Sequence, residues 1–389
     1  MRKVIILLCV CFLLAGCAGE HASITEAPEA TAIMAPIETI QAPEATTPET
    51  VPTFLPPDPI QELLDGMSLE ERIGQLFLAR CQDVSAIEDI QAYHLGGFIL
   101  FGRDFKNQTV SSIQNKISSY QSAAKIPLLI AVDEEGGTVT RVSSNAAFRK
   151  QKFSSPRNLY NSGGMERVLD EEDEKCRLLK SLGINVNMGP VCDIATDPKS
   201  FMYERSLGQD FEVTSEFVEQ MVSLTDSHQI GNVLKHFPGY GNNADTHTGI
   251  VTDSRSLEKL EGNDLLPFRA GIQAGCGAIL VSHTIVACLD STLPASLSPA
   301  IHQYMRQNMA FDGVIVTDDL AMQAITDQYG AGEAAVLAIQ AGNDLLCSSE
   351  YAIQYEAVLD AVLDGRIDTD TLNNAVRNVL EWKTALGLI

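Results

Sequence analysis

The residues best suited to chemistry lie in one stretch, from Lys235 to His247. It begins as an apolar strand, Asn232–Leu234, and loses that character at Lys235-His236. A proline and two glycines then predict that the strand ends in a loop. The loop carries Asp245 and His247, and two residues of separation let the carboxylate orient the imidazole, which can then donate and accept a proton near neutral pH. Taken alone, Asp-x-His is also the pattern of a polar surface loop with a satisfied histidine.

Other polar residues follow apolar runs in the same way, at the carboxyl ends of predicted strands. They are Asp133-Glu134-Glu135 with Arg141 just beyond, Asp193 with Glu204-Arg205 in the following loop, Ser282-His283, and Asp318-Asp319. Any one of them could be a structural cap or a salt bridge. Because random burial would not place polar groups at the same end of so many strands, we expect them to form one site.

Eight apolar runs of strand length predict the elements that position these residues. The runs are Gln75–Ala79, Gly97–Phe101, Leu128–Val132, Asn185–Met188, Asn232–Leu234, Ala278–Val281, Val314–Thr317 and Asp344–Cys347. Stretches of helix length separate most of them, for example Val213–Ser227 and Ala331–Ala341. This alternation favours an α/β fold, a (β/α)8 TIM-type barrel that forms a single catalytic domain over residues 58–389. The first strand is the least distinct, because it could continue the preceding helix.

The motifs at these strand ends resemble the β-N-acetylglucosaminidase (β-hexosaminidase) branch of glycoside hydrolase family 3. The resemblance runs from about Leu64 to the C-terminus and keeps the family's order. Its motifs are Asp133-x-Glu135-Gly136-Gly137 with Arg141, Glu204-Arg205-Ser206-x-Gly208, Lys235-His236-Phe237-Pro238-Gly239-x-Gly241, Asp245-x-His247 and Thr317-Asp318-Asp319-Leu320-x-Met322. The chain departs from the common pattern at Tyr240, where His is common, and at Thr246, where Ser is common. It also departs at Glu134 and Thr138, and all four departures spare the core set.

The resemblance implies a role for each core residue. Asp318 would be the nucleophile that forms a glycosyl-enzyme intermediate, and Lys235 nearby would help to keep it ionised by charge attraction. His247, oriented by Asp245, would protonate the leaving oxygen and then activate water. Asp319, on the opposite side of its strand, would cap the next helix. The residues that would bind the sugar at its hydroxyls and acetamido group are Asp133, Arg141, Arg205, Lys235 and His236.

The resemblance therefore predicts a retaining exo-β-N-acetylglucosaminidase that uses no metal or organic cofactor. Its expected substrates are peptidoglycan fragments or chitooligosaccharides with terminal β-linked GlcNAc. One alternative is another reaction on the same fold, a β-N-acetylglucosaminide phosphorylase or a β-glucosidase, because a histidine acid/base repels an attacking phosphate less than a carboxylate would. The other alternative is a non-catalytic sugar-binding lipoprotein. An intact proton donor and a strand-end aspartate argue against it.

The N-terminal residues have the pattern of an export signal. Arg2 and Lys3 precede an apolar run of eleven residues, too short to span a bilayer, and Leu14-Ala15-Gly16-Cys17 resembles a lipobox. We expect residues 1–16 to be a lipoprotein signal peptide and Cys17 to carry the lipid, palmitate included. Residues 17–57, rich in Thr, Pro and Glu, would form a disordered linker. The predicted location is the extracellular face of the cell membrane, anchored by lipid rather than spanning.

Charge and cysteine content limit the partners. The chain has 51 acidic and 27 basic residues and a formal net charge of −24, and an acidic surface disfavours nucleic acid. Nine cysteines occur without a C-x-x-C pair, so a zinc or redox site is not predicted. The expected partners are a carbohydrate substrate and the membrane, with the protein itself a monomer.

Overall fold

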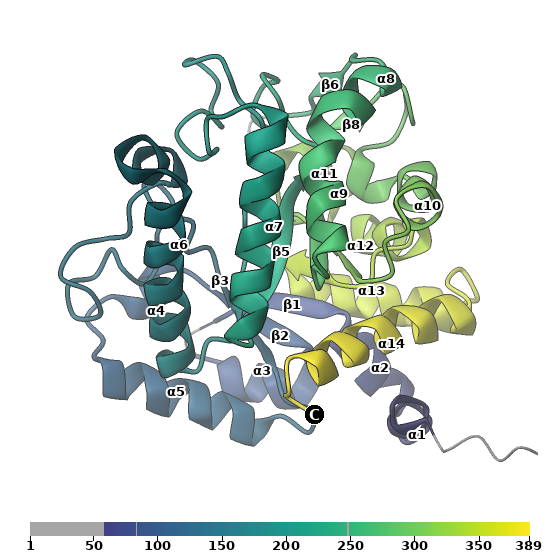
Figure 1. The fold of residues 1–389 in the computed structure, drawn as a ribbon. Helices are drawn as coiled ribbons and strands as arrows, with labels where there is room; N and C mark the ends of the chain where they lie inside the picture. Colours follow the sequence, from purple (N-terminus) through teal and green to yellow (C-terminus); the bar gives the residue numbers. More distant parts are fainter. Residues whose placement is uncertain (1–57, 83, 247–248) are drawn as a thin grey trace, which may run out of the picture. The chain divides into compact units, whose positions relative to one another are not determined.

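Eight parallel strands form one sheet that is nearly closed into a barrel, with helices around it (Figure 1). This computed structural model describes residues 58–82, 84–246 and 249–389, so the predicted signal peptide, Cys17 and linker lie outside the described residues. The strand order is β10-β1-β2-β3-β4-β5-β7-β9. A bridge between Val316 and Leu345, with a 3.0 Å hydrogen bond from Thr317 N to Leu345 O, brings the first and last strands of that order together.

The eight predicted strands are all present, with small differences at their ends. The barrel strands are β1 (Phe77–Arg80), β2 (Gly97–Leu100), β3 (Leu129–Val132), β4 (Val186–Asn187), β5 (Gly231–Phe237), β7 (Ala278–Val281), β9 (Val314–Thr317) and β10 (Leu346–Ser348). Gln75 is the last residue of the preceding helix, so the ambiguity at the first strand is real. Strand β5 continues through Lys235-His236 to Phe237 instead of ending before them. A short parallel pair, β6 (Thr252–Asp253) and β8 (Ile285–Val286), lies outside the barrel sheet.

Helices follow most of the strands and cover the barrel (Figure 1). The main helices are α1 (Pro59–Asp65), α2 (Leu69–Gln75), α3 (Ala86–Tyr93), α4 (Gly102–Phe105), α5 (Val110–Ala123), α6 (Pro156–Leu182), α7 (Phe211–Ser227), α8 (Leu257–Lys259), α9 (Leu265–Gln273), α10 (Pro299–Asn308), α11 (Gln323–Tyr329), α12 (Ala331–Ala341), α13 (Tyr351–Leu363) and α14 (Thr369–Ala385). A π-helical turn, Leu260–Asp264, leads into α9, and a 3₁₀ turn, Ala295–Leu297, precedes α10. None of the helices in the described ranges is long and apolar enough to cross a membrane.

Helix α14 closes the barrel at the end where the strands begin. Its Trp382 packs with the apolar residues of the barrel interior, such as Ala278 and Val314. The fit is close: a Cβ added to Gly277, just before β7, would lie 2.2 Å from Trp382 Nε1, so only glycine fits there. Because apolar side chains fill this end of the barrel, polar side chains can gather only where the strands end.

Candidate active site

A cavity of about 400 Å³ opens where the barrel strands end. Six residues proposed from the sequence line it, and they come from β5 and from the segments that follow β3, β4 and β9. The lining residues are Arg80, Ile99, Phe101, Asp133, Val139, Arg141, Met188, Arg205, Lys235, His236, Leu280, Asp318, Asp319, Met322 and Cys347. Asp133, Arg141, Arg205, Lys235, His236 and Asp318 are thus brought together. Asp245 is described, but His247 lies outside the described residues, as does Cys17.

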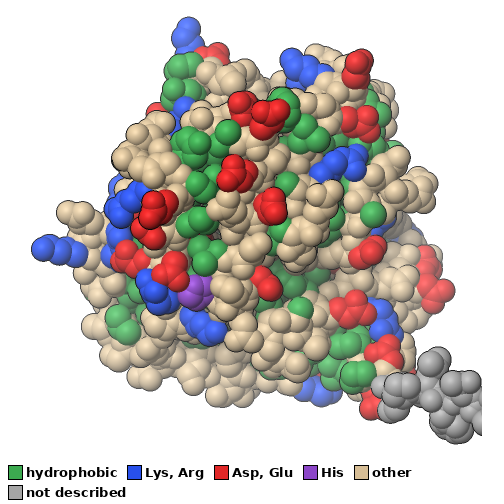
Figure 2. All heavy atoms as spheres, in the orientation of Figure 1, with side chains coloured by type: hydrophobic (Ala, Val, Ile, Leu, Met, Phe, Trp, Pro, Cys, Tyr) green, Lys and Arg blue, Asp and Glu red, His purple; other side chains and the backbone are tan. Residues whose placement is uncertain are grey.

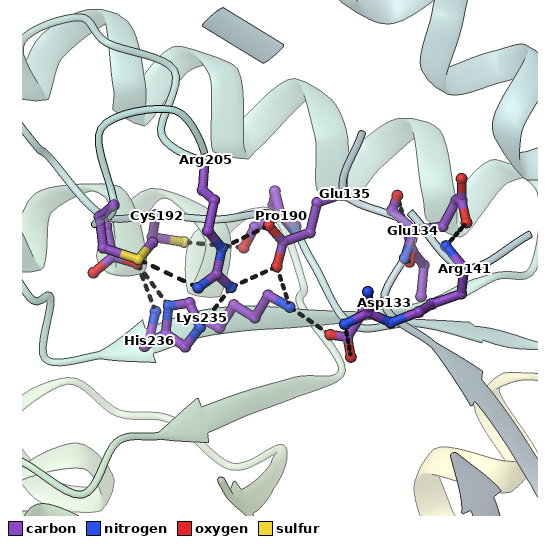
Figure 3. Close-up of polar contacts among 12 residues, drawn as sticks. Asp133, Glu134, Glu135, Arg141, Pro190, Cys192, Arg205, Lys235 and His236 are labelled. Carbon is purple, nitrogen blue, oxygen red and sulfur yellow. Dashed lines mark hydrogen bonds and ion pairs between the residues drawn. The ribbon is translucent and has the colours of Figure 1, made fainter. Parts of the chain in front are cut away.

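Lys235 sits at the centre of the polar contacts, as Figure 3 shows. Its side chain is 2% exposed, and Nζ lies 2.7 Å from Asp133 Oδ1 and 2.6 Å from Glu135 Oε1. Burial alone would lower the pKa of this amine, but the two carboxylates raise it above its usual value. Lys235 is therefore a fixed cation that joins the end of β3 to β5.

Glu135 holds the second cation of the cavity, and the sequence pattern did not single it out as a site residue. Arg205 Nε and Nη2 donate to its two carboxylate oxygens at 2.9 and 2.7 Å, a bidentate pair. Burial would raise the pKa of the Glu135 carboxyl, but the charges of Lys235 and Arg205 hold it well below its usual range. Its position in the Asp-x-Glu-Gly-Gly motif was the one available signal.

His236 is oriented by Asp193, 43 residues away in the chain. Asp193 Oδ2 accepts from His236 Nδ1 at 2.8 Å and from the His236 backbone N at 3.2 Å. On the other side of the ring, Nε2 lies 3.1 Å from Arg205 Nη2. Because a guanidinium can only donate, Nε2 must accept, and these partners assign a neutral ring with its proton on Nδ1. His236 thus links Asp193 to Arg205.

Two of the departures from the family pattern contact each other. The hydroxyl groups of Tyr240 and Thr246 are 2.6 Å apart, and both residues are buried. The Tyr240 backbone N also donates to Asp193 Oδ1 at 2.6 Å, and its ring packs edge-on against His236. The contact therefore ties the loop that carries Asp245 to the Asp193–His236 pair.

Glu134, another departure, shapes the loop that carries Arg141. Its carboxylate is fully buried and accepts from the backbone N of Arg141 and of Val142, both at 2.7 Å. The Glu134 backbone N in turn donates to Asn187 Oδ1 at 3.0 Å. The side chain thus fixes the turn after β3, which holds Arg141 at the cavity wall.

Asp318 and Asp319 both line the cavity but make different contacts. Asp318 Oδ1 accepts from the Asp319 backbone N at 2.9 Å. Asp319 accepts from Ala321 N at 3.0 Å and from Ser349 N at 3.1 Å, and the Ser349 hydroxyl donates to it at 2.5 Å. The prediction that Asp319 caps the next helix is wrong: α11 begins at Gln323, and Met322 occupies its N-cap. Asp319 instead joins the turn after β9 to the loop after β10.

Among the described residues, no group of three or more His, Cys, Asp and Glu side chains has the arrangement of a metal site. The chemistry that the geometry offers is that of a carboxylate, Asp318, facing a cavity whose other walls carry fixed hydrogen-bond donors and acceptors. Such a cavity suits a polar molecule of the size of one sugar ring.

The chain is similar in sequence and structure to one enzyme family. Residues 68–382 match the model of the glycosyl hydrolase family 3 N terminal domain. Beta-hexosaminidase LpqI of Mycobacterium tuberculosis (strain ATCC 25618 / H37Rv) is 29% identical over 329 residues, which cover 82% of this chain and 83% of that protein. The solved structure of M tuberculosis LpqI has a TM-score of 0.76 at 27% identity and covers 83% of this chain and 96% of that one.

A second solved structure extends beyond the length of this chain. The family 3 β-N-acetylglucosaminidase from Paenibacillus sp. str. FPU-7 is 31% identical, with a TM-score of 0.77 over 83% of this chain. The match covers 63% of the Paenibacillus chain, so this protein spans less than two thirds of that relative.

Proposed function

The chain belongs to glycoside hydrolase family 3 and is a glycoside hydrolase, and we propose that it is a retaining exo-β-N-acetylglucosaminidase. The proposal extends to its substrates, peptidoglycan fragments or chitooligosaccharides with a terminal β-linked GlcNAc. The main support for the proposal is that Asp318 and the proposed sugar-binding residues line the same cavity. The alternative of a non-catalytic sugar-binding lipoprotein does not fit a glycoside hydrolase.

Asp318 is the nucleophile in this proposal. A carboxylate oxygen attacks the anomeric carbon while the bond to the leaving oxygen breaks, which gives a glycosyl ester and inverts the configuration. The imidazole of His247 supplies the proton to the leaving oxygen, and Asp245 orients it. In the second step the same imidazole takes a proton from water, whose oxygen attacks the anomeric carbon and releases Asp318. Two inversions retain the original configuration.

The fixed contacts described above support a binding role for the rest of the site. Asp133, Arg141, Arg205, Lys235 and His236 line the cavity, and their hydrogen bonds and ion pairs hold them in place before a sugar arrives. Preorganised donors and acceptors lose little conformational entropy when they bind. In this scheme they contact the hydroxyls and the acetamido group.

Trapping of the covalent intermediate tests the nucleophile. A 5-fluoro-GlcNAc reagent should leave its sugar ester-linked to Asp318, as read by mass spectrometry of peptides. Asp318→Asn should abolish nearly all turnover and leave sugar binding measurable, because shape is kept and charge is lost. A label on Asp319, or a first-formed product of inverted configuration by NMR, would contradict the assignment. Failure to trap anything, with tight binding of a thiazoline-type inhibitor, would indicate substrate-assisted chemistry instead.

Release of 4-nitrophenol separates this activity from the alternative reactions of the fold. We expect hydrolysis of the β-GlcNAc derivative, slow hydrolysis of the β-glucoside and no dependence on added phosphate. A rate that requires phosphate, with GlcNAc 1-phosphate as product, would identify a phosphorylase. His247→Ala should lose about 10²- to 10⁴-fold with poor leaving groups and less with 4-nitrophenol, which needs little protonation. Equal losses in the glycosylation step would argue against His247 as the acid.

Lipid anchoring at Cys17 is a separate proposal, supported by the sequence Leu14-Ala15-Gly16-Cys17 alone. Labelled palmitate should enter the protein, and Cys17→Ala should prevent it. Labelling that persists in the variant would rule out this lipidation site.

A further inference from the structure

Two arginines that line the cavity, Arg80 and Arg141, make few polar contacts with the described residues. The side chain of Arg80, the last residue of β1, makes no hydrogen bond or ion pair with any described residue, and its Nε is buried without a partner. Arg141 Nε is likewise buried and unpartnered. Its guanidinium makes one long ion pair among the described residues, with 3.8 Å between Arg141 Nη2 and Asp133 Oδ2.

The two guanidinium groups share one aromatic ring. The Cζ of Arg80 lies 4.7 Å from the centroid of Phe101 and the Cζ of Arg141 lies 5.7 Å from it, and all three residues line the cavity. Stacking on the ring limits how the planar groups can turn. Since each Nε is covered, the donors left to meet a ligand are the terminal Nη groups.

The other cations of the cavity are matched by carboxylates. Lys235 contacts Asp133 and Glu135, and Arg205 forms its bidentate pair with Glu135. Two positive charges there face two negative charges at hydrogen-bond distance. Among the described residues Arg80 has no carboxylate at hydrogen-bond distance, although Asp318 and Asp319 line the same cavity and add negative charge to it.

Two neighbouring guanidinium groups with so few carboxylate contacts are unexpected in this chain. Its formal net charge is −24, and Figure 2 shows acidic side chains spread over the visible face. Such a protein repels acidic ligands unless a local group attracts them. Two guanidinium groups held against one ring are a local attraction of that kind, and their forked donors fit the paired oxygens of an oxyanion.

We propose that Arg80 and Arg141 form a binding site for an oxyanion, a carboxylate, sulfate or phosphate group, beside the sugar pocket. The anion is either a substituent of the glycan or a free ion in the cavity. The glycan form rests on the proposed function, whereas binding of a free ion does not. Arg80 is then a specificity-determining residue that favours an anionic ligand over a neutral one.

Matched ligand pairs test the glycan form. Binding is measured by calorimetry on the full chain with Asp318→Asn, which prevents turnover. One ligand pair is chitobiose and GlcNAc-β-1,4-MurNAc, which adds a lactyl carboxylate. The other pair is GlcNAc and GlcNAc 6-sulfate. At least one acidic member should bind more tightly than its neutral partner, and Arg80→Gln should reduce that preference by about tenfold, the scale of one charge-assisted contact. The control is Arg177→Gln. Arg177 is exposed on α6 and pairs with Asp173, so its substitution removes the same charge and should leave the preference for the acidic ligand unchanged.

Inorganic phosphate and sulfate test the free form in the wild-type chain at low salt. Binding that Arg80→Gln abolishes and Arg177→Gln spares would assign the site to a free ion, and binding should weaken as salt is raised. If neither the acidic glycans nor the free ions lose affinity in Arg80→Gln, the proposal is wrong. Failure of the neutral sugars to bind would count against the proposed function instead, while the titrations with free ions would still test the arginines.

Discussion

The buried pair of Glu135 and Arg205 allows a sharp test, because the chain contains the same pair in the open. Glu174 and Arg149 form the same bidentate geometry on the surface, with distances of 2.8 and 2.9 Å. The Glu174 side chain is 50% exposed, against 2% for Glu135. Glu135→Gln and Glu174→Gln therefore remove the same charge from the same arginine geometry; the two carboxylates differ in burial, and Glu135 also contacts Lys235.

Glu135→Gln should lower the free energy of unfolding by about 3 kcal/mol. Removal of one partner from a buried ion pair costs about 3–5 kcal/mol, because a buried charge is left uncompensated. The lower end of this range applies because Lys235 retains its ion pair with Asp133 in the variant, so Arg205 is the main cation that loses its carboxylate partner. Glu174→Gln should cost about 1 kcal/mol or less, since water screens an exposed pair. Urea unfolding at pH 7 measures both.

The second half of the test is the activity of Glu135→Gln, measured as kcat/KM. Arg205 and Lys235 should move, and a displacement of about 1 Å in a positioning group can cost about 100-fold in kcat/KM. Glu135→Asp keeps the charge and should restore part of both losses. Equal stability losses for Glu135→Gln and Glu174→Gln, or full activity in Glu135→Gln, would refute the view that the buried carboxylate holds the two cations.

Two further predictions concern other buried groups. Asp193→Asn removes the acceptor that fixes the tautomer of His236 and should lower kcat/KM by about 10- to 100-fold. The control is Asp173→Asn, which alters a surface pair in which Asp173 Oδ1 lies 2.8 Å from His228 Nε2, and it should change kcat/KM little. Equal kinetics for the two variants would contradict the role of Asp193. Burial lowers the pKa of Lys383 to about 7, so between that value and its unfolded value the unfolded state binds more protons and stability rises with pH. The free energy of unfolding of the wild type relative to Lys383→Met should therefore rise by about 1 kcal/mol from pH 6.5 to pH 8, as measured by urea unfolding, and a flat difference would mean that Lys383 is not buried as a neutral amine.

The barrel could be predicted from the sequence because its signal is local. Each strand is a short apolar run, and a helix-length stretch separates most pairs, so periodicity and length suffice. The errors lie at element ends. Gln75 belongs to α2 because its backbone continues the helix, and β5 runs through Lys235-His236 although both are polar. A polar pair at a strand end marks the mouth of a barrel rather than the end of the strand.

The partnerships within the site could not be predicted, since they join residues far apart in the chain. Asp193 and His236 are separated by 43 residues, and Glu135 and Arg205 by 70. No spacing rule connects such pairs, because the pairing of β3 with β4 and of β4 with β5 in the sheet brings them together. Arg80 was missed for a different reason: it belongs to none of the motifs, and its role is visible only from the ring and the cavity that it contacts.

These contacts also change the account of which groups support Asp318. The sequence suggested attraction to Lys235, but Asp133 and Glu135 already lie within 2.7 Å of that amine, so little of its charge is left to act on a third carboxylate. The Asp319 backbone N–H contacts Asp318 directly, because it donates to Asp318 Oδ1 at 2.9 Å. Asp319 is itself held by Ser349 and Ala321. The neighbouring aspartate thus acts through its backbone to support the proposed nucleophile, while its carboxylate fixes the turn in which both lie.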